Sequence, residues 1–561
     1  MLFCSRARRL LASTSNFSLK KCRFYANSNQ NTSFSNKLKE GPGLKEFIAG
    51  NDEPVLLERP NIPYLSDNIQ IAPKRKVYFD VYGCQMNLND TEIVWSILKN
   101  EGFEKTEIED EADIFLVMTC AIREGAESKI WWRLDHLRGL KRRRAWARNR
   151  HKPPVKIGIL GCMAERLKEK LIEKEKSVDI VAGPDSYRDL PRLLAVTESG
   201  QTAVNVLLSL DETYADVVPV RLNQNSISAF ISIMRGCDNM CTYCIVPFTR
   251  GRERSRPIAS IVDEVRHLSD QGVKEVTLLG QNVNSYRDTS LVTEKQETKM
   301  ARGFKTVYKS KLGGVRFAEL LAQVAAVDPD MRVRFTAAHP KDFPDEVLQV
   351  VRGHRNVCSM LHLPAQAGSS AVLARMRRGY TREDYLDLVQ HVKETIPGVG
   401  LSTDIICGFC GETDAEFEET MSLMRLVDYN QAFLFPYSMR EKTTAHRRYA
   451  DDVPAAVKAA RHARLLRLYM RRSHEVNHRD VGGRRLVLVE GTHARTGQVV
   501  GRNEFYLKVL FDQQPIPSPT GPRPATPGDY VAVEITSAKS SMFTGRPIRH
   551  TSINEFYRED V

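Results

Sequence analysis

Between residues 74 and 196, the hydrophobic pattern alternates between short β-type runs and helical stretches. Four apolar runs are strand candidates: 77–82, 114–118, 155–160 and 178–182. After the first run, apolar residues within 93–98 repeat at helical spacing, and Gly102 ends that stretch. Strands separated by helices predict right-handed βαβ units and a parallel sheet, which makes this an α/β segment.

A second block, from 222 to 478, repeats the alternation. Its strand candidates are 230–234, 275–279, 332–335, 358–362, 401–406 and 432–435. Helical stretches such as 260–271 and 381–395 lie between them, and the polar stretch 287–313 is interpreted as an insertion. Six β/α repeats predict an open or partial (β/α)6 barrel, in which functional residues come from the carboxyl ends of the strands.

The third segment, 481–555, contains β runs joined by turns rich in proline and glycine. The runs are 485–490, 505–511 and 530–536, and the loop 514–528 holds six prolines. Several short strands in one small segment predict a small β-barrel. Barrels of the OB type often bind oligonucleotides, and a purely structural lid is the alternative.

The composition describes a globular protein. The chain has 561 residues, of which 42% are hydrophobic and 27% charged, and this length suffices for about three domains. No apolar stretch approaches the roughly 20 residues that a membrane-spanning helix needs. Eleven cysteines are too few for a disulfide scaffold, so clustered cysteines indicate metal ligands in a reducing compartment.

Much of the net charge of +13 comes from the start of the chain. Residues 1–39 contain eight Lys or Arg residues, many serines and asparagines, and no acid. This pattern is typical of a mitochondrial transit peptide, and a disordered basic tail is the alternative. Residues 40–73 are interpreted as a linker. The remaining chain is only mildly basic, so nucleic-acid binding has to be argued from local patches.

The most informative motif is a short loop with the spacing C-x3-C-x2-C, formed by Cys237, Cys241 and Cys244. Three close thiolates can bind three irons of a 4Fe–4S cluster. The fourth iron then has no protein ligand, and an open coordination site is what a catalytic metal needs. Zinc is the alternative, although no fourth Cys or His lies within a dozen residues on either side.

A second set of cysteines follows three of the strand candidates. Cys84, Cys120 and Cys162 each come directly after an apolar run. Because the carboxyl ends of parallel strands meet at one edge of a sheet, these cysteines are expected to converge there. Three at the same topological point favour a second cluster. The alternative is three unrelated buried cysteines, since cysteine is among the most buried residue types.

Several strings of the sequence resemble the radical S-adenosylmethionine (SAM) methylthiotransferases of the MiaB type. The matching strings are 82–87, 119–123, 161–162, 235–256, 280–285, 361–366 and 408–412. They run in family order over about 75–555. The segments 341–349 and 437–440 look like the animal mitochondrial branch in particular.

The resemblance implies three domains: a methylthiotransferase N-terminal domain (74–196), a radical SAM core (222–478) and a TRAM domain (481–555). It implies that Cys237, Cys241 and Cys244 hold the SAM-cleaving cluster, and that Cys84, Cys120 and Cys162 hold an auxiliary 4Fe–4S cluster that donates sulfur. The implied reaction adds a methylthio group to C2 of N6-isopentenyladenosine at position 37, beside the tRNA anticodon. The C2–H bond is poorly suited to acid–base chemistry, which favours a cofactor-borne radical.

Further site residues are expected around SAM. Tyr243 could pack on the SAM adenine, with ordinary packing as the alternative. The other candidates, which sit at or near predicted strand ends and could equally be turn or capping residues, are Asn282, Gln366, Ser402 and Asp404.

Two basic stretches are candidates for RNA contact. Arg250, Arg252, Arg254 and Arg256 alternate after the cysteine loop and would share one face of an extended segment, suited to tRNA phosphates. A solvated face paired with acids such as Glu253 is the alternative. Lys141–Arg144 with Arg148, Arg150 and Lys152 form the second stretch, for which an exposed helix end is the alternative.

The expected partners are tRNA and a low-potential electron donor such as a ferredoxin-type protein, and the expected location is the mitochondrial matrix. The segments 501–506 and 541–545 depart from the usual TRAM strings, which weakens the case for RNA contact there. Three alternatives remain: methylthiolation of threonylcarbamoyladenosine in tRNA, methylthiolation of a ribosomal-protein aspartate, and a non-catalytic protein that binds and regulates a kinase.

Overall fold

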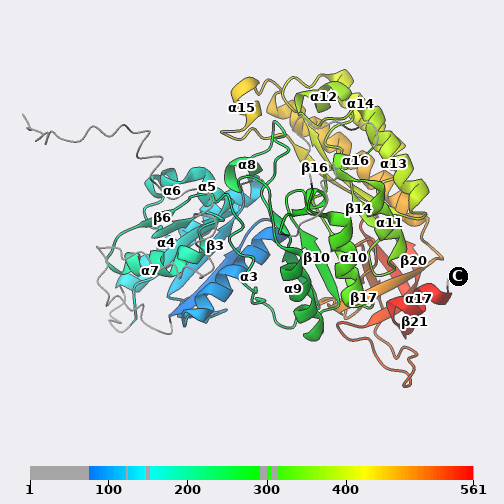
Figure 1. The fold of residues 1–561 in the computed structure, drawn as a ribbon, viewed down its shortest axis with the longest axis horizontal. Coiled ribbons are helices and arrows are strands. Elements are labelled where there is room, and N and C mark those ends of the chain that lie inside the picture. Colours follow the sequence, from blue (N-terminus) through cyan, green and yellow to red (C-terminus); the bar gives the residue numbers. More distant parts are fainter. Residues whose placement is uncertain are drawn as a thin grey trace, which may run out of the picture. The chain divides into compact units, whose positions relative to one another are not determined.

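The computed structural model describes residues 75–121, 124–146, 152–290, 300–301, 304 and 313–559 (Figure 1). The predicted transit peptide (1–39) and linker (40–73) lie outside the described residues. No helix in these ranges is both long and apolar enough to span a membrane.

The N-terminal segment folds as a six-stranded parallel sheet in the order β2-β1-β3-β4-β5-β6. Its strands are β1 (Lys76–Val81), β2 (Glu104–Lys105), β3 (Ile114–Thr119), β4 (Lys156–Gly161), β5 (Ile180–Ala182) and β6 (Ala203–Asn205). Its helices are α3 (Gln85–Asn100), α4 (Glu124–Trp146), α5 (Cys162–Leu167), α6 (Glu169–Lys174) and α7 (Leu190–Glu198). The four predicted strands are confirmed, and the two short outer strands, β2 and β6, were missed.

Both faces of this sheet are covered, as β3 shows. Its residues are all buried, and Leu116 packs into one hydrophobic core while Val117 packs into the other. The first core contains side chains of α3 and α7, and the second contains side chains of α4. Parallel strands buried on both faces read as continuous apolar runs, which is why β3 and β4 were recognisable in the sequence.

The central segment is the predicted partial barrel, built from two three-stranded parallel sheets. One sheet has the order β13-β10-β7, and the other β14-β15-β16. The strands are β7 (Ser228–Ser232), β10 (Glu275–Leu279), β13 (Arg332–Phe335), β14 (Met360–His362), β15 (Gly400–Cys407) and β16 (Gln431–Pro436). A parallel bridge between Val333 and Val357 connects the two sheets. The partial (β/α)6 fold class is therefore confirmed.

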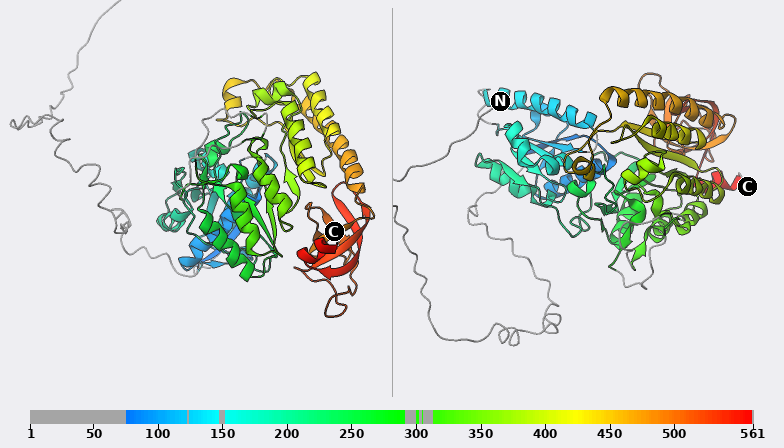
Figure 2. Two further views of the ribbon diagram at one scale, coloured as in Figure 1. Left: turned by 45° about the vertical axis from the view of Figure 1, so that its right-hand side comes forward. Right: turned by 90° about the horizontal axis from the view of Figure 1, so that it is seen from above.

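Helices cover the outside of this barrel (Figures 1 and 2). The helices are α9 (Ile258–Asp270), α10 (Phe317–Val327), α11 (Asp345–Gly353), α12 (Ser370–Arg375), α13 (Arg382–Thr395), α14 (Asp414–Leu426), α15 (Thr444–Arg448) and α16 (Ala455–His478). Four two-residue strands lie between the main elements: β8 (Met234–Arg235), β9 (Arg254–Ser255), β11 (Arg287–Asp288) and β12 (Val315–Arg316). The short helix α8 (Val246–Thr249) follows the cysteine loop.

The C-terminal segment is a closed five-stranded barrel in the order β17-β18-β19-β21-β20. Its elements are β17 (Arg484–Thr492), β18 (Val499–Arg502), β19 (Lys508–Phe511), β20 (Tyr530–Ala538), β21 (Met542–Thr551) and the final helix α17 (Ile553–Glu559). The small barrel is confirmed, although β18 and β21 were not predicted. Arg332 and Arg334 of β13 donate hydrogen bonds to carbonyl groups of Arg502 and Asn503. Because Arg332 begins β13, the small barrel meets the amino-terminal strand ends.

Candidate active site

The late cysteine loop, Cys237–Cys244, begins two residues after β8 and turns on two residues with positive φ. Gly236 has φ +75° and Met240 φ +48°. A Cβ atom at position 236 would lie 1.9 Å from the Arg252 carbonyl oxygen, so this position requires glycine. The Cys237 amide donates to the Gly251 carbonyl oxygen at 3.3 Å, which ties the loop to the segment after α8. The sequence thus shapes the loop independently of any ligand.

The three sulfurs of this late trio interact with one another. Burial raises the pKa of the Cys237 thiol well above its usual range, and the neighbouring Cys244 and Cys241 raise it further. Burial and Cys241 also raise the pKa of Cys244 to about 12. Ionising Cys237 or Cys244 at this site is therefore costly unless a metal compensates the charge, so metal binding would release their protons.

The two candidate ligand sets, the early and late cysteine trios, differ from a site that binds one metal ion. Within the described ranges, no group of three His, Cys, Asp or Glu side chains is close enough to hold one metal ion. A 4Fe–4S cluster has a different requirement, because each cysteine sulfur binds its own iron. The donor chemistry of three thiols in one short loop suits three corners of such a cluster and would leave the fourth iron without a protein ligand.

The early trio gathers at one edge of the N-terminal sheet, where the sequence placed it. Cys84 caps α3 after β1, Cys120 follows β3, and Cys162 begins α5 after β4. These strands are neighbours in the sheet. A Cβ atom on Gly83 would lie 3.3 Å from the Cys120 sulfur. Burial raises the pKa of Cys162 to about 11, and Cys120 and Cys84 contribute to this rise.

The early trio contacts the segment that follows the late trio. Cys162 packs with Ala121 and with Ile245, the residue directly after Cys244, and Phe248 of α8 packs beside them. Arg250, just past α8, donates from Nε to the Cys162 sulfur at 3.2 Å. The segment that follows the late trio therefore contacts a ligand candidate of the early trio.

Three of the four arginines predicted to face tRNA phosphates are buried, which corrects that prediction. Arg250 pairs with Asp90 at 2.7 Å, Arg254 with Asp185 at 3.0 Å, and Arg256 with Glu264 at 2.7 Å. Only Arg252 is exposed, with 65% of its side chain accessible. The alternating arginines do not share a solvated face, because carboxylates from α3, α9 and the N-terminal sheet segment neutralise them inside the protein.

The second basic stretch is divided in the same way. Lys141 pairs with Asp179 at 2.6 Å, and Arg144 lies 3.5 Å from Asp113. Arg142, Arg143 and Lys152 are exposed, and Arg148 and Arg150 lie outside the described residues. The exposed members remain candidates for RNA contact.

Asn282 and Gln366, two of the residues predicted to contact SAM, follow the carboxyl ends of β10 and β14, whereas Ser402 and Asp404 lie within β15. Tyr243 packs against the barrel core, and its hydroxyl accepts from Arg378 at 3.4 Å. Asn282 is buried, and its side chain bonds Asp342 and the His339 amide. Gln366 has φ +70° and bridges Ile405 through its backbone. These contacts suit a structural role, and the SAM contacts stay predictions.

Ser402 and Asp404 are joined by a residue that the sequence analysis missed. His362 lies 3.0 Å from the Ser402 hydroxyl through Nδ1 and 3.3 Å from Asp404 Oδ2 through Nε2. The three side chains share one face because His362 pairs with Ser402 in the parallel register and Asp404 is two residues further along. The sequence did contain a signal for His362, because this residue lies inside the family-like string 361–366.

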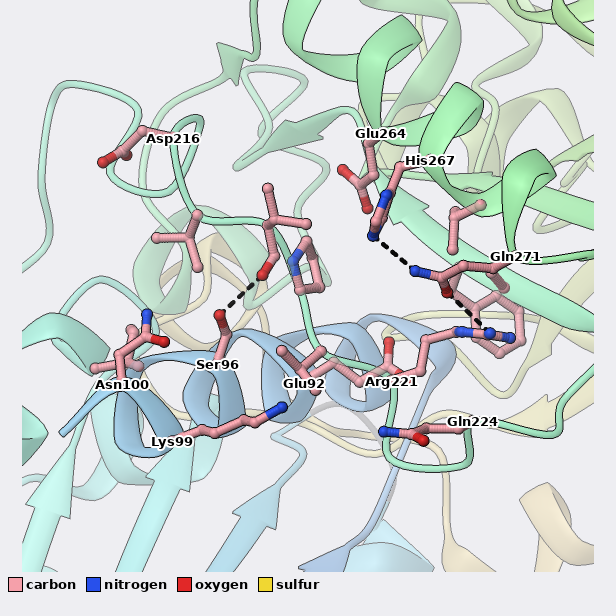
Figure 3. Close-up of a pocket in the computed structure, with 18 of the residues that line it drawn as sticks. Glu92, Ser96, Lys99, Asn100, Asp216, Arg221, Gln224, Glu264, His267 and Gln271 are labelled. Carbon is pink, nitrogen blue, oxygen red and sulfur yellow. Dashed lines mark hydrogen bonds between the residues drawn. The ribbon is translucent and has the colours of Figure 1, made fainter. Parts of the chain in front are cut away.

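A cavity of about 1040 Å³ lies elsewhere, between α3, α9 and the segment 216–225 (Figure 3). No cysteine lines it. Arg221 donates to Gln271 at 2.9 Å and Ser96 donates to the Val218 carbonyl oxygen at 2.8 Å, which fixes the connecting segment along both helices. Burial raises the pKa of Glu92, on its wall, to about 7.

Comparison with known proteins agrees with this geometry. Residues 231–424 match the radical SAM superfamily, and residues 76–183 match the uncharacterized protein family UPF0004. The chain is 55% identical to mitochondrial tRNA methylthiotransferase CDK5RAP1 of Mus musculus over 535 residues, which cover 93% of this chain and 90% of the relative. The Homo sapiens protein of that name is 52% identical over 583 residues, covering 97% and 96%. The chain belongs to the radical SAM methylthiotransferase family.

This methylthiotransferase is also similar in sequence to bacterial proteins. The tRNA-2-methylthio-N(6)-dimethylallyladenosine synthase of Chloroherpeton thalassium is 47% identical over 476 residues, covering 85% of this chain and 96% of the relative. The two family matches divide the cysteines between them. The UPF0004 match contains the early trio, and the radical SAM match contains the late trio. A radical SAM enzyme uses a 4Fe–4S cluster and SAM, and the late trio fits that cluster.

Proposed function

We propose that this protein is a mitochondrial tRNA methylthiotransferase, which converts N6-isopentenyladenosine at position 37 to its 2-methylthio derivative. The family assignment and the names of the relatives support the reaction and the mitochondrial location. The single observation that carries the proposal is the contact of Cys162, of the early trio, with Ile245 and Arg250, which follow the late trio in the chain. Sulfur insertion needs a radical source near a sulfur source, and this contact joins a candidate ligand of the sulfur source to the segment that follows the candidate ligands of the radical source.

The late trio would hold the SAM-cleaving cluster. When bound, that cluster supplies the one-electron reduction of SAM from which the hydrogen-abstracting radical derives. The chain's own contribution is to fix three thiols in one short loop and to limit the access of water to two of them. Cys237 and Cys241 are each only 8% exposed. The residues expected to orient SAM are Tyr243, Asn282, Gln366, Ser402 and Asp404.

The early trio would hold an auxiliary 4Fe–4S cluster that serves as the sulfur source. Its three cysteines follow adjacent strands, and the charge of Cys120 helps to raise the pKa of both Cys84 and Cys162, which supports a common ligand. Asn87 helps to shape this edge, because its side-chain amide donates to the Tyr82 carbonyl oxygen at 2.6 Å. Arg250 places a positive charge beside Cys162, where it would balance the negative charge of a ligated thiolate.

The proposal includes partners. The substrate is the anticodon loop of tRNA, approached by the exposed Arg252 and by the exposed part of the second basic stretch. A low-potential one-electron donor of the ferredoxin type would reduce the late cluster, and the matrix would be the place of the reaction. The small C-terminal barrel meets the amino-terminal strand ends, so its role would be tRNA binding and not a lid on the cysteine loop.

Nucleoside mass spectrometry tests the reaction directly. Anaerobically reconstituted protein, SAM and a reductant are incubated with isopentenylated anticodon stem-loop RNA. We expect 2-methylthio-N6-isopentenyladenosine from the parent protein and none from a triple variant with Cys237, Cys241 and Cys244 changed to Ala. A threonylcarbamoyladenosine substrate provides the comparison. Methylthiolation of the threonylcarbamoyladenosine substrate alone would contradict the proposal. An unchanged amount of 2-methylthio-N6-isopentenyladenosine in tRNA from cells that lack the protein would contradict it as well.

A further inference from the structure

The late cysteine loop is attached to the turn after α12. The Thr242 amide donates to the Met376 carbonyl oxygen at 3.0 Å, and the Thr242 hydroxyl donates to the Arg375 carbonyl oxygen at 2.8 Å. The turn itself needs two residues of positive φ, Arg377 at +57° and Gly379 at +76°. Arg378 lies between them, so the backbone of this turn directs its side chain toward the loop.

The Arg378 guanidinium is buried, with 4% of the residue exposed, and its contacts are specific. Nη1 donates to the Cys241 sulfur at 3.4 Å and to the Tyr243 hydroxyl at 3.4 Å. Nη2 donates to the Pro364 carbonyl oxygen at 3.0 Å, and Nε donates to the Tyr380 hydroxyl at 3.0 Å. Four hydrogen bonds from three nitrogens hold the planar group in one orientation against the cysteine loop.

Arg378 differs from four other buried arginines in the kind of partner it has. Arg250 and Arg235 share Asp90, Arg256 pairs with Glu264, and Arg334 pairs with Glu275. Among the described residues, the hydrogen-bond acceptors of Arg378 are a sulfur, two hydroxyls and a carbonyl, with no carboxylate. A buried charge is costly unless an opposite charge compensates it. Cys241 is the acceptor in this set that can carry a negative charge as a metal-bound thiolate. The carbonyl oxygen stays neutral, and the two tyrosine hydroxyls would have to ionise to tyrosinate, which is unusual.

We infer that Arg378 is a positioning residue that raises the reduction potential of the SAM-cleaving cluster. Reduction adds one electron, taken from an external one-electron donor, to a cluster that Cys241 ligates as a thiolate. The added negative charge interacts favourably with the fixed guanidinium, and hydrogen bonds to cluster sulfurs and local charge are recognised determinants of cluster potential. No bond forms or breaks in this step. The inference rests on the proposed function only for the presence of the late cluster, and it requires no tRNA chemistry.

The test uses full-length protein in which Cys84, Cys120 and Cys162 are changed to Ala, so that only the late cluster remains. Arg378→Gln, Arg378→Lys and, as matched control, the adjacent Arg377→Gln are made in this background. Iron and labile sulfide are measured first, and the cluster is then titrated with dithionite and followed by electron paramagnetic resonance. We expect Arg378→Gln to lower the ratio of reduced to oxidised cluster about tenfold at a given potential, which equals about 59 mV for one electron.

The expected order is parent and Arg377→Gln together, Arg378→Lys shifted less, and Arg378→Gln shifted most toward negative potential. A parent-like potential in Arg378→Gln would overturn the inference, and so would equal shifts in the lysine and glutamine variants. If Arg378→Gln does not retain its cluster, the reduction potential of the Arg378→Lys variant tests the inference instead. A loaded lysine variant with a more negative potential supports the inference, whereas a parent-like potential or loss of the cluster in this variant also overturns it. Failure of the parent to bind iron at all would instead contradict the proposed function.

Discussion

Arg250 donates a hydrogen bond from its Nε to the sulfur of Cys162, over 3.2 Å. The two residues are 88 positions apart and belong to the partial barrel and to the N-terminal sheet. The same guanidinium pairs with Asp90, which also lies 2.8 Å from Arg235. Burial opposes ionisation of Asp90, but the charges of Arg235 and Arg250 outweigh it and lower the pKa of Asp90. One carboxylate on α3 thus joins two arginines to the early trio.

The first prediction concerns this network. Arg250→Gln should destabilise the protein by about 3 kcal/mol, because removing one partner of a buried ion pair leaves the other partner undercompensated. Asp90 retains Arg235, which keeps the loss from being larger. Arg252→Gln is the matched control, since Arg252 is two residues away and exposed, and it should change stability by less than about 0.5 kcal/mol. Thermal unfolding of both variants measures the difference. Equal, small effects would show that the Arg250 contacts do not hold the interface.

The second prediction concerns the start of the late loop. Gly236→Ala should deplete the iron bound by the late trio, because its Cβ would lie 1.9 Å from the Arg252 carbonyl oxygen and the loop backbone would have to move. Gly272→Ala is the control: its φ is +79°, but nothing lies within 4 Å of the added Cβ. The control variant should therefore lose only about 1 kcal/mol of stability, because alanine is disfavoured in the left-handed conformation, and it should keep its iron. Full iron content in Gly236→Ala would disprove the proposed rigidity of this loop.

The sequence predicted those structural features that depend on residues close together in the chain. The strands β3 and β4 were recognisable because each is a continuous apolar run, and the cysteine that follows each run could be placed at the sheet edge. The strands β2 and β21 were missed for the opposite reason. β2 is only two residues long and both are charged, and β21 contains Pro547 and two arginines.

The arginines after the cysteine loop show what a single sequence does not encode. An alternating row of arginines has the same pattern whether it faces phosphate or buried carboxylates. Asp90 is 160 residues from Arg250, and Asp185 is 69 residues from Arg254, so only the fold brings the pairs together. His362 was missed because a lone histidine between apolar residues looks like a core position until Ser402 and Asp404 are seen beside it.

The third prediction is a pH dependence of stability. Burial raises the pKa of Glu92 to about 7, with Glu264 adding repulsion, while the Leu222 amide and Arg221 oppose the shift. Below about pH 4.5 the carboxyl is protonated in both the folded and the unfolded protein. As the pH rises toward 7 the unfolded chain releases this proton first, so the folded state loses stability, by about 3 kcal/mol in total.

Glu92→Gln removes this titration and can keep the acceptor for the Leu222 amide. The variant should therefore unfold at a higher temperature than the parent at pH 8 and at nearly the same temperature at pH 5. Differential scanning calorimetry at the two pH values measures this directly. A stability difference that does not change with pH would mean that Glu92 is already ionised in the folded protein at pH 5.

The central claim, that each cysteine trio holds its own 4Fe–4S cluster, is tested most directly by iron and labile sulfide analysis of anaerobically reconstituted protein. The parent should bind about eight irons per chain, and triple Cys→Ala variants of either the early or the late trio should each bind about four. A parent that binds about four irons, or loss of all iron when one trio alone is removed, would contradict the claim.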